Sequence, residues 1–380
     1  MLYLDHAATT PVRPEVLKAA WPYLTDEFAN PSSVHEAGLR AKAALDWARQ
    51  AAATALGALP DEIVFTSGGT EANNLAIKGI ALGQPRGRHI ISAGTEHSSV
   101  LACLEFLERV HGFEVTLLGV DADGRIAPQD LRDAIRPDTT LVTLLTFNNE
   151  VGTRQDIPTL AAIAAEAGVP FHTDAVQAAG WMDLNVGDLG VQALSLSGHK
   201  FGAPKGSGLA YLSSYLQVEP VVHGGGQESG LRSGTQNVAW AVAIAVALQL
   251  ASRPGAEAAR IGAVTDTFID GVLRDNPRAK LTGAKPETGE RHPAIASFTF
   301  DGLNGETLLL ELEQAGVTCS SGSACSAGST EPSHVLLSLG LEPDTCRTAV
   351  RFSFGHDATA DQATRAIAAL KRSIDRVSSL

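Results

Sequence analysis

Short apolar runs alternate with helical patterns from about residue 60 to residue 215, an order typical of parallel strands joined by crossover helices. We expect buried strands at 63–65, 89–92, 114–118, 141–147, 169–172, 194–196 and 209–212. Apolar residues recur at helical spacing over 71–82, 100–110 and 158–166. The pattern predicts an α/β fold with a large doubly wound domain and a mainly parallel sheet of seven strands. Its ligand should lie at the carboxyl ends of the strands.

A long apolar helix is expected over 238–251, and the helix-breaking sequence Arg253-Pro254-Gly255 follows it. The chain beyond this break has the pattern of a smaller α+β unit, with strands at 296–300 and 350–354 and helices at 306–314 and 359–377. We therefore predict a large domain over residues 14–253. Residues 1–13 and 254–380 are predicted to form the small domain.

Composition narrows the possible classes of function. The chain has 42 acidic and 29 basic residues, and its net charge of −13 has the wrong sign for a general binder of nucleic acid or anionic membranes. The longest apolar run, 238–248, is shorter than the ~20 residues that span a bilayer. Asp5 and His6 lie where a signal peptide would need its basic and apolar regions. We expect a cytoplasmic protein that binds small molecules or proteins.

The cysteines are too sparse for a disulfide framework, because only Cys103, Cys319, Cys325 and Cys346 occur and no two form a Cys-x-x-Cys pair. Cys325 lies in the middle of residues 320–330, which contain only Ser, Gly, Ala, Thr and this one Cys. That composition predicts a mobile loop. A zinc site that includes Cys319 would need two more ligands, and none is close in sequence. Cys325 is therefore the candidate for a working thiol.

Two charged residues follow predicted strands. Lys200 lies in a Gly-rich segment, 197–206, beside a hydroxyl and an imidazole. Such an amine can form a Schiff base with a cofactor while its neighbours hold a phosphate. Asp174 ends an earlier strand and suits an acid that keeps a pyridinium nitrogen protonated. The structural alternatives are a solvated loop lysine and a helix-capping aspartate, and each motif alone leaves them open.

Three further motifs could bind a charged or planar group. Residues 66–71, Thr-Ser-Gly-Gly-Thr-Glu, run from a strand into a helix and offer N–H groups and hydroxyls to an anion, although the P-loop ending is missing. His97 opens another helix, where an imidazole can stack on a ring or shuttle protons. Arg351 lies in a strand, and its guanidinium can donate two hydrogen bonds to a carboxylate. The alternatives are a capped helix, a structural histidine and a surface ion pair.

These motifs stand in the order found in a known family. The matching segments are 3–11, 30–35, 66–71, 95–97, 148–150, 172–174, 197–200, 232–235, 320–325 and 331–334. The chain resembles the pyridoxal-phosphate-dependent cysteine desulfurases of the class V aminotransferase family, of the type that serves iron–sulfur cluster assembly and nitrogenase maturation. The resemblance runs nearly end to end. It implies the fold of the fold-type I pyridoxal-phosphate (PLP) transferases.

The resemblance also implies a role for each site residue, with Cys325, Lys200 and His97 as the catalytic residues. Lys200 would hold PLP in a Schiff base and later move the α-proton of the substrate. Around the cofactor, Asp174 would pair with the pyridine nitrogen, Gln177 would hydrogen-bond the ring oxygen, His97 would stack on the ring, and Gly69, Thr70, Ser197 and His199 would hold the phosphate. Thr235 would reach that phosphate from the other subunit of a homodimer, and Asn149 and Arg351 would bind the substrate carboxylate. No resident metal is implied.

By the same resemblance, Cys325 attacks the sulfur of L-cysteine, which leaves L-alanine and a persulfide on the enzyme. The loop at about 319–331 would then offer the sulfur to an acceptor or iron–sulfur scaffold protein, for cluster assembly or the synthesis of other thio-cofactors. Cys325 would transiently contact the acceptor's cluster. Cys319 lies outside the family motif. The sequence ends at Leu380, without the longer tail that helps some relatives to dock the scaffold, so the acceptor stays open.

Rival interpretations differ in what they require of the chain. A class V aminotransferase needs no nucleophilic cysteine, so the loop around Cys325 argues against it. A lyase that prefers selenocysteine fits the same motifs. A non-catalytic thiol protein or metal-binding interaction protein would leave Lys200 and Asp174 without a purpose.

Overall fold

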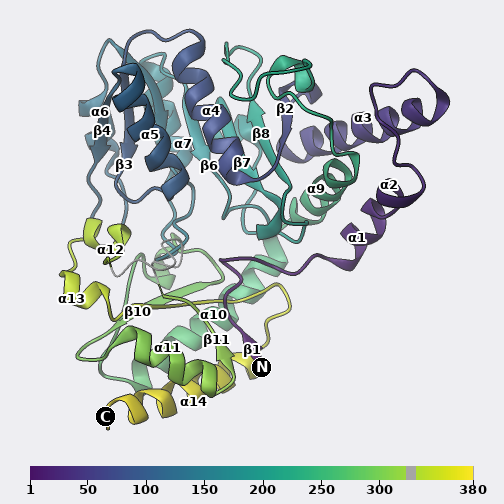
Figure 1. The fold of residues 1–380 in the computed structure, drawn as a ribbon. Coiled ribbons are helices and arrows are strands. Elements are labelled where there is room, and N and C mark those ends of the chain that lie inside the picture. Colours follow the sequence, from purple (N-terminus) through teal and green to yellow (C-terminus); the bar gives the residue numbers. More distant parts are fainter. Residues whose placement is uncertain (322–330, 380) are drawn as a thin grey trace.

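The computed structural model describes residues 1–321 and 331–379, and a seven-stranded sheet forms the centre of its larger part (Figure 1). The strands lie in the order β2 (Ile63–Thr66), β8 (Gly208–Leu212), β7 (Ala193–Ser197), β6 (Phe171–Asp174), β5 (Thr139–Thr143), β3 (His89–Ala93) and β4 (Glu114–Leu118). Strand β8 runs antiparallel to β2 and β7, whereas the other neighbouring pairs are parallel. The predicted mainly parallel seven-stranded sheet is thus confirmed.

Helices cover both faces of this sheet. One face packs against α4 (Gly69–Gly83) and α5 (Ser98–His111), and the other against α3 (Glu36–Leu56), α6 (Pro128–Ala134), α7 (Ile157–Glu166), α8 (Val186–Leu189) and α9 (Val238–Ala251). Successive strand residues point to opposite faces, so Ile90 joins the first core and Ile91 the second. Burial on both faces explains why the strands read as continuous apolar runs. The short helices α1 (Pro14–Ala20) and α2 (Pro22–Thr25) contact α9.

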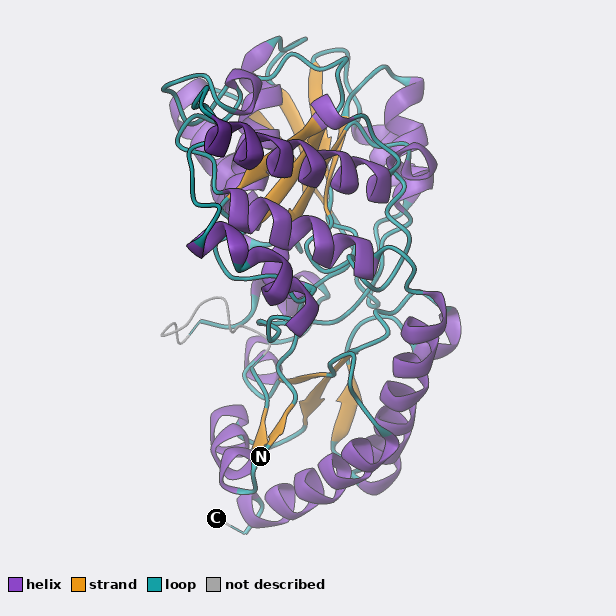
Figure 2. Cartoon of the chain, turned by 90° about the vertical axis from the view of Figure 1, so that its right-hand side faces the viewer, coloured by secondary structure: helices purple, strands orange, loops and turns teal. Residues whose placement is uncertain are grey.

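A second, three-stranded antiparallel sheet lies in the lower part of Figure 2. Its order is β12 (Val350–Ser353), β10 (Ile295–Phe300) and β9 (Ala279–Leu281), and it packs with α10 (Gly255–Asp275), α11 (Gly305–Gln314) and α14 (Ala360–Val377). The N-terminal strand β1 (Leu2–Tyr3) pairs with β11 (Val317–Thr318). The remaining short elements are η1 (Pro60–Glu62), η2 (Gly198–Lys200), η3 (Glu228–Gly230), η4 (Pro286–Thr288), α12 (His334–Ser338) and α13 (Pro343–Cys346). The division into residues 14–253 and residues 1–13 with 254–380 stays a proposal.

Helix α9 ends at Ala251 and α10 begins at Gly255, across a bend of 75°. This break coincides with the Pro-Gly sequence that the pattern singled out. Within the described residues, no single helix has the length and apolar composition to cross a membrane. Helices α9 and α10 reach that length and composition only when they are taken together as a bent pair.

Strand β5 departs most from the expected bounds, because it covers Thr139–Thr143 instead of 141–147. Two buried threonines extend its start: Thr140 Oγ1 donates to Gly87 O at 2.8 Å, and Thr139 Oγ1 lies 2.8 Å from His89 Nδ1. Beyond the strand, Thr146 N still donates to Asp174 O at 2.9 Å. The chain therefore follows β6 toward the carboxyl edge of the sheet.

Candidate active site

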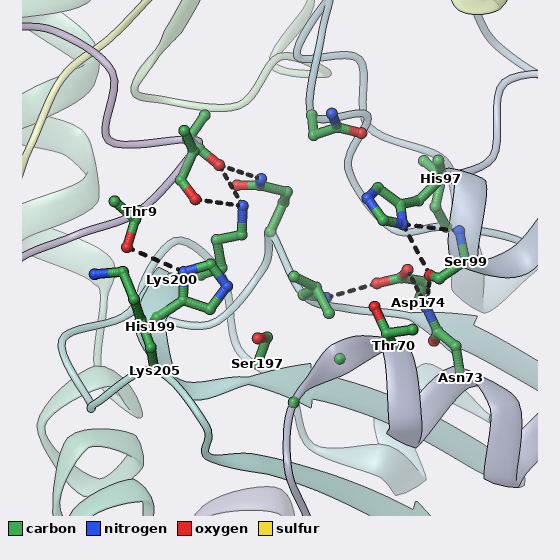
Figure 3. A pocket seen from close by; sticks show the side chains of 18 of the residues that line it. Thr9, Thr70, Asn73, His97, Ser99, Asp174, Ser197, His199, Lys200 and Lys205 are labelled. Atoms are coloured by element: carbon green, nitrogen blue, oxygen red, sulfur yellow. Dashed lines mark hydrogen bonds between the residues drawn. The ribbon is translucent and has the colours of Figure 1, made fainter. Parts of the chain in front are cut away.

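A cavity of about 660 Å³ opens at the carboxyl edge of the large sheet (Figure 3). The predicted site residues that line it are Gly69, Thr70, His97, Asn149, Asp174, Gln177, Ser197, His199, Lys200 and Arg351. They come from turns after β2, β3, β6 and β7, from the segment after β5, and from β12 of the second sheet. Residues 7–9, Asn73, Ser99 and Lys205 are among the other residues that line it. The topology thus brings together most of the residues that the motifs singled out.

The start of α4 has the features that favour binding of an anion. Gly68 is its N-cap and supplies no side chain to cap the helix. The first N–H groups of a helix have no partner within it, and together with the helix dipole they favour an anion. A Cβ atom on Gly69 would lie 2.7 Å from Val176 Cγ2 and 3.2 Å from Ser197 Cβ. Glycine is therefore needed here for the helix end to approach β7 so closely.

Lys200 lies in the short helical turn η2 directly after β7. Its ammonium group donates to the carbonyls of Ala7 and Ala8, the latter at 3.1 Å. His199 Nδ1 lies 3.1 Å from Thr9 Oγ1. Burial, followed by the charges of Lys200 and Lys205, lowers the pKa of His199 to about 4. His199 is therefore a neutral hydrogen-bonding group near pH 7, and Lys200 is anchored to the N-terminal segment.

Asp174 ends β6 and lies in the floor of the cavity. Its Oδ1 accepts from Val176 N at 3.0 Å and its Oδ2 accepts from Asn73 Nδ2 at 2.7 Å. Asn73 Nδ2 also lies 2.9 Å from Ser99 Oγ, and Ser99 Oγ lies 2.8 Å from His97 Nδ1. Asn73 and Ser99 were not among the predicted site residues. The sequence places them only near the starts of the two helices that follow β2 and β3, a position that many amides and hydroxyls share.

Arg351 is only 1% exposed, yet its guanidinium borders the cavity. Nη1 donates to Asn149 O at 2.7 Å and Nη2 pairs with Asp5 Oδ1 at 2.8 Å. Nε has no hydrogen-bond partner within the described residues. Gln177 Nε2 donates to Ala7 O at 3.0 Å. Asp5 was expected only as part of a motif, and the structure gives it a role as the partner of this buried cation.

Two predicted residues are not part of this cavity. Thr235 lines a separate space of about 270 Å³, together with Ser67, Glu228 and Arg232. The prediction that Thr235 contacts the cofactor phosphate of another subunit is not tested by the structure of a single chain. Cys325 lies outside the described residues, so its placement stays a prediction.

In the three described cysteines, burial raises the pKa of the thiol. Burial raises the pKa of Cys103 to about 11 and also raises the pKa values of Cys319 and Cys346, in Cys319 with a further contribution from Asp5. The thiolate is the reactive form, so these thiols are suppressed near neutral pH. The described residues also hold no cluster of three or more His, Cys, Asp or Glu side chains able to bind a metal ion.

The comparisons with known proteins assign the family. Residues 2–365 match the family model described as Aminotransferase class-V, and the chain belongs to this family. Within it, the chain resembles the cysteine desulfurases. It is 42% identical over 378 residues to the cysteine desulfurase IscS of Dictyoglomus turgidum, covering 99% of this chain and 95% of that protein. It is 44% identical to the cysteine desulfurase IscS of Methanosarcina thermophila, and this match covers 96% of this chain and 90% of that protein.

Solved structures give the same assignment. A NifS-like protein superposes with a TM-score of 0.91 at 31% identity, covering 99% of both chains. A structure described as SspA in complex with cysteine has a TM-score of 0.82 at 38% identity and covers 93% of this chain and 99% of that one. The enzymes of this family depend on PLP. The resemblance inferred from the motifs is thus confirmed at the level of family and fold.

Proposed function

We propose that the protein is a PLP-dependent cysteine desulfurase, which converts L-cysteine to L-alanine and takes the sulfur onto Cys325 as a persulfide. The observation that carries the proposal is the single cavity onto which Lys200, Asp174 and the N-terminus of α4 converge. An amine, an anion cup and a carboxylate at separate points of one cavity match the aldehyde, phosphate and pyridine nitrogen of PLP. The cysteine desulfurase relatives support the choice of substrate.

The donor set of the cavity suits the groups of PLP. The uncapped first turn of α4, with Gly69 and Thr70, would hold the phosphate together with Ser197 and His199. Asp174, fixed by two donors, would keep the proton on the pyridine nitrogen. Gln177 would hydrogen-bond the ring oxygen and His97 would cover the ring. When bound, PLP supplies an electron sink for the amino-acid substrate.

Arg351 and Asn149, which line the cavity, would bind and orient the substrate. Arg351 Nε is a buried donor without a hydrogen-bond partner among the described residues, and it would donate to the α-carboxylate of L-cysteine, which Asn149 would also bind. Asp5 and Asn149 O hold the other guanidinium nitrogens, which fixes the plane of the fork. Lys200 would hold the cofactor and move the proton at the substrate Cα.

Sulfur transfer needs a thiolate, and we assign it to Cys325. Its sulfur would form a new S–S bond with the substrate sulfur while the Cβ–S bond breaks. The electron pair left on Cβ takes up a proton, which gives L-alanine and a Cys325 persulfide. Burial makes the other three cysteines unsuitable for this step.

The persulfide would pass to an acceptor, such as a scaffold for iron–sulfur clusters or an enzyme of thio-cofactor synthesis, in the cytoplasm. We further propose a homodimer. The position of Thr235 outside its own cofactor cavity supports this assembly, because it leaves the residue available to a second subunit.

The test is to incubate the purified protein with PLP and L-cysteine and to measure the visible absorption, the alanine formed and the mass of the Cys325 peptide. We expect a coloured protein, alanine release and one added sulfur on that peptide. Lys200→Ala should lose the Schiff-base absorption and at least about a thousand-fold of activity. Cys325→Ser should keep the colour and lose alanine release, whereas Cys319→Ser should retain both.

Two results would contradict the proposal. A protein that stays colourless with excess PLP would remove every cofactor-based function. Undiminished desulfuration by Cys325→Ser would remove the assignment of the nucleophile while leaving the cofactor site intact.

A further inference from the structure

A line of hydrogen bonds joins the residue proposed to pair with the ring nitrogen of the cofactor to the residue proposed to cover the ring face (Figure 3). It runs from the Asp174 carboxylate through Asn73 and Ser99 to the His97 imidazole. The four side chains come from β6, α4 and the start of α5, and Asn73, Ser99 and Asp174 are buried. The line therefore joins one strand of the large sheet to the two helices on one of its faces.

The direction of every bond in this line is determined. Ser99 N can only donate, and it lies 3.1 Å from His97 Nδ1, so Nδ1 is the acceptor. Ser99 Oγ, 2.8 Å from the same nitrogen, must then donate its hydrogen to it. As acceptor, Ser99 Oγ receives one hydrogen of Asn73 Nδ2, and the second hydrogen of that amide goes to Asp174.

The orientation of the Asn73 amide follows from the same chemistry. A flipped amide would direct its oxygen at the Asp174 carboxylate, and two acceptors would face each other in a buried place. Asn73 therefore has to present its NH₂ group to Asp174. The charge on Asp174 thus determines the orientation of the Asn73 amide, and the Asn73 amide determines the orientation of the Ser99 hydroxyl.

We propose that Ser99, oriented by Asn73, is a positioning residue that fixes the neutral His97 imidazole in the tautomer with its proton on Nε2. This inference rests on the proposed function, since it concerns the residue that would cover the cofactor ring. Because Nδ1 is engaged by two donors, Nε2 carries the hydrogen. His97 then donates a hydrogen bond through Nε2 and takes up no proton there, which leaves the movement of the substrate proton to Lys200.

The experiment uses the PLP-loaded protein labelled with ¹⁵N-histidine, whose ring-nitrogen signals separate protonated from unprotonated nitrogens. The His97 signals are assigned as those missing from His97→Gln. We expect one bare nitrogen and one protonated nitrogen in the wild type. Ser99→Ala removes the hydroxyl donor and leaves the 3.1 Å backbone donor at Nδ1, so both signals should move part of the way toward a tautomer average. Loss of one hydrogen bond should lower kcat about two- to ten-fold.

Two variants serve as controls. Ser98→Ala changes the exposed neighbouring serine and should leave the signals and the rate unchanged. Ser99→Thr keeps a hydroxyl and should restore both.

Unchanged His97 nitrogen signals in Ser99→Ala would overturn the inference, whatever the rate of that variant. That result would leave the proposed function untouched, since wild-type alanine formation decides the function separately. A wild-type spectrum with the proton on Nδ1 would also overturn it.

Discussion

His172 shows how single polar residues are accommodated inside the large sheet. It is fully buried in β6. Its Nδ1 lies 2.8 Å from Thr143 Oγ1 on β5, and its Nε2 lies 2.9 Å from Ser195 Oγ on β7. Both ring nitrogens thus meet hydroxyls, which can act as donor or acceptor. The neutral imidazole is satisfied, whereas a charged one would be desolvated. His172 therefore links three neighbouring strands two residues before Asp174.

The buried His172 should make the stability of the protein depend on pH. Burial lowers its pKa to about 3, against about 6.5 in an unfolded chain. Between these values the unfolded chain binds a proton that the folded protein does not, so this contribution is complete above about pH 6.5 and is lost as the pH falls toward about 3. We expect the urea midpoint to fall from about pH 7.5 to about pH 5, and to fall less in His172→Gln.

Replacing the exposed His223 by Gln serves as the matched control and should keep the decline of the wild type. Burial also lowers the pKa of His292 to about 3, so His172→Gln should remove only part of the decline. Glu96 acts with the opposite sign, because burial raises the pKa of its carboxyl and the folded protein keeps the proton. Equal declines in His172→Gln and wild type would show that His172 does not carry the effect.

The site residues that were predictable from the sequence are those with reactive groups at strand ends, such as Lys200 and Asp174. Asn73 and Ser99 lack such a signal, because amides and hydroxyls near helix starts are common for capping reasons alone. Their role depends on α4 and α5 lying side by side on one face of the sheet, as their shared core shows. That arrangement is a property of the fold and not of either helix.

At the scale of elements, apolar runs located the strands of the large sheet because both of its faces are buried. The pattern could not tell that β8 runs antiparallel, since a strand buried on both faces has the same composition in either direction. This direction matters, because it places Lys205 and Gly206, just before β8, at the carboxyl edge of the parallel strands. No element was predicted over Glu36–Leu56, although its alanine-rich composition and the stop at Gly57 are signals for α3.

The close approach of α4 to β7 makes Gly69 a sensitive position for cofactor binding. In Gly69→Ala the new methyl group would press on Val176 and Ser197, at 2.7 and 3.2 Å, and would displace the start of the helix from the proposed phosphate position. We expect about ten-fold weaker binding of PLP. The measurement is a titration of the cofactor-free protein followed by visible absorption.

Gly255 provides the matched control, because it is also the first residue of a helix and a Cβ there would meet nothing within 4 Å. Gly255→Ala should bind PLP as the wild type does. Equal affinities of the two variants would mean that the approach of α4 to β7 does not govern the phosphate position.

At the scale of the whole molecule, exposed apolar side chains are concentrated near the N-terminus, around α1, α2 and α3. Trp21 is 58% exposed, Phe28 77% and Leu39 55%. Figure 1 shows these helices beside α9 at one side of the large sheet. Large apolar residues gathered in one exposed part of a chain indicate a surface that binds protein. The proposed homodimer would cover them and would bring Thr235 to the other subunit.

This arrangement predicts that Phe28→Asp weakens the dimer and the binding of PLP together. A charge at this aromatic position should raise the dissociation constant of the dimer at least about ten-fold, measured by sedimentation. PLP affinity should fall in parallel, because each monomer would lose the partner's contribution to the phosphate site. Leu310→Asp is the control, since Leu310 is similarly apolar and 60% exposed but lies on α11. If Phe28→Asp leaves the dimer as stable as Leu310→Asp does, the interface does not include this surface. If Phe28→Asp weakens the dimer but leaves PLP affinity unchanged, Thr235 does not contribute to the cofactor site of the other subunit.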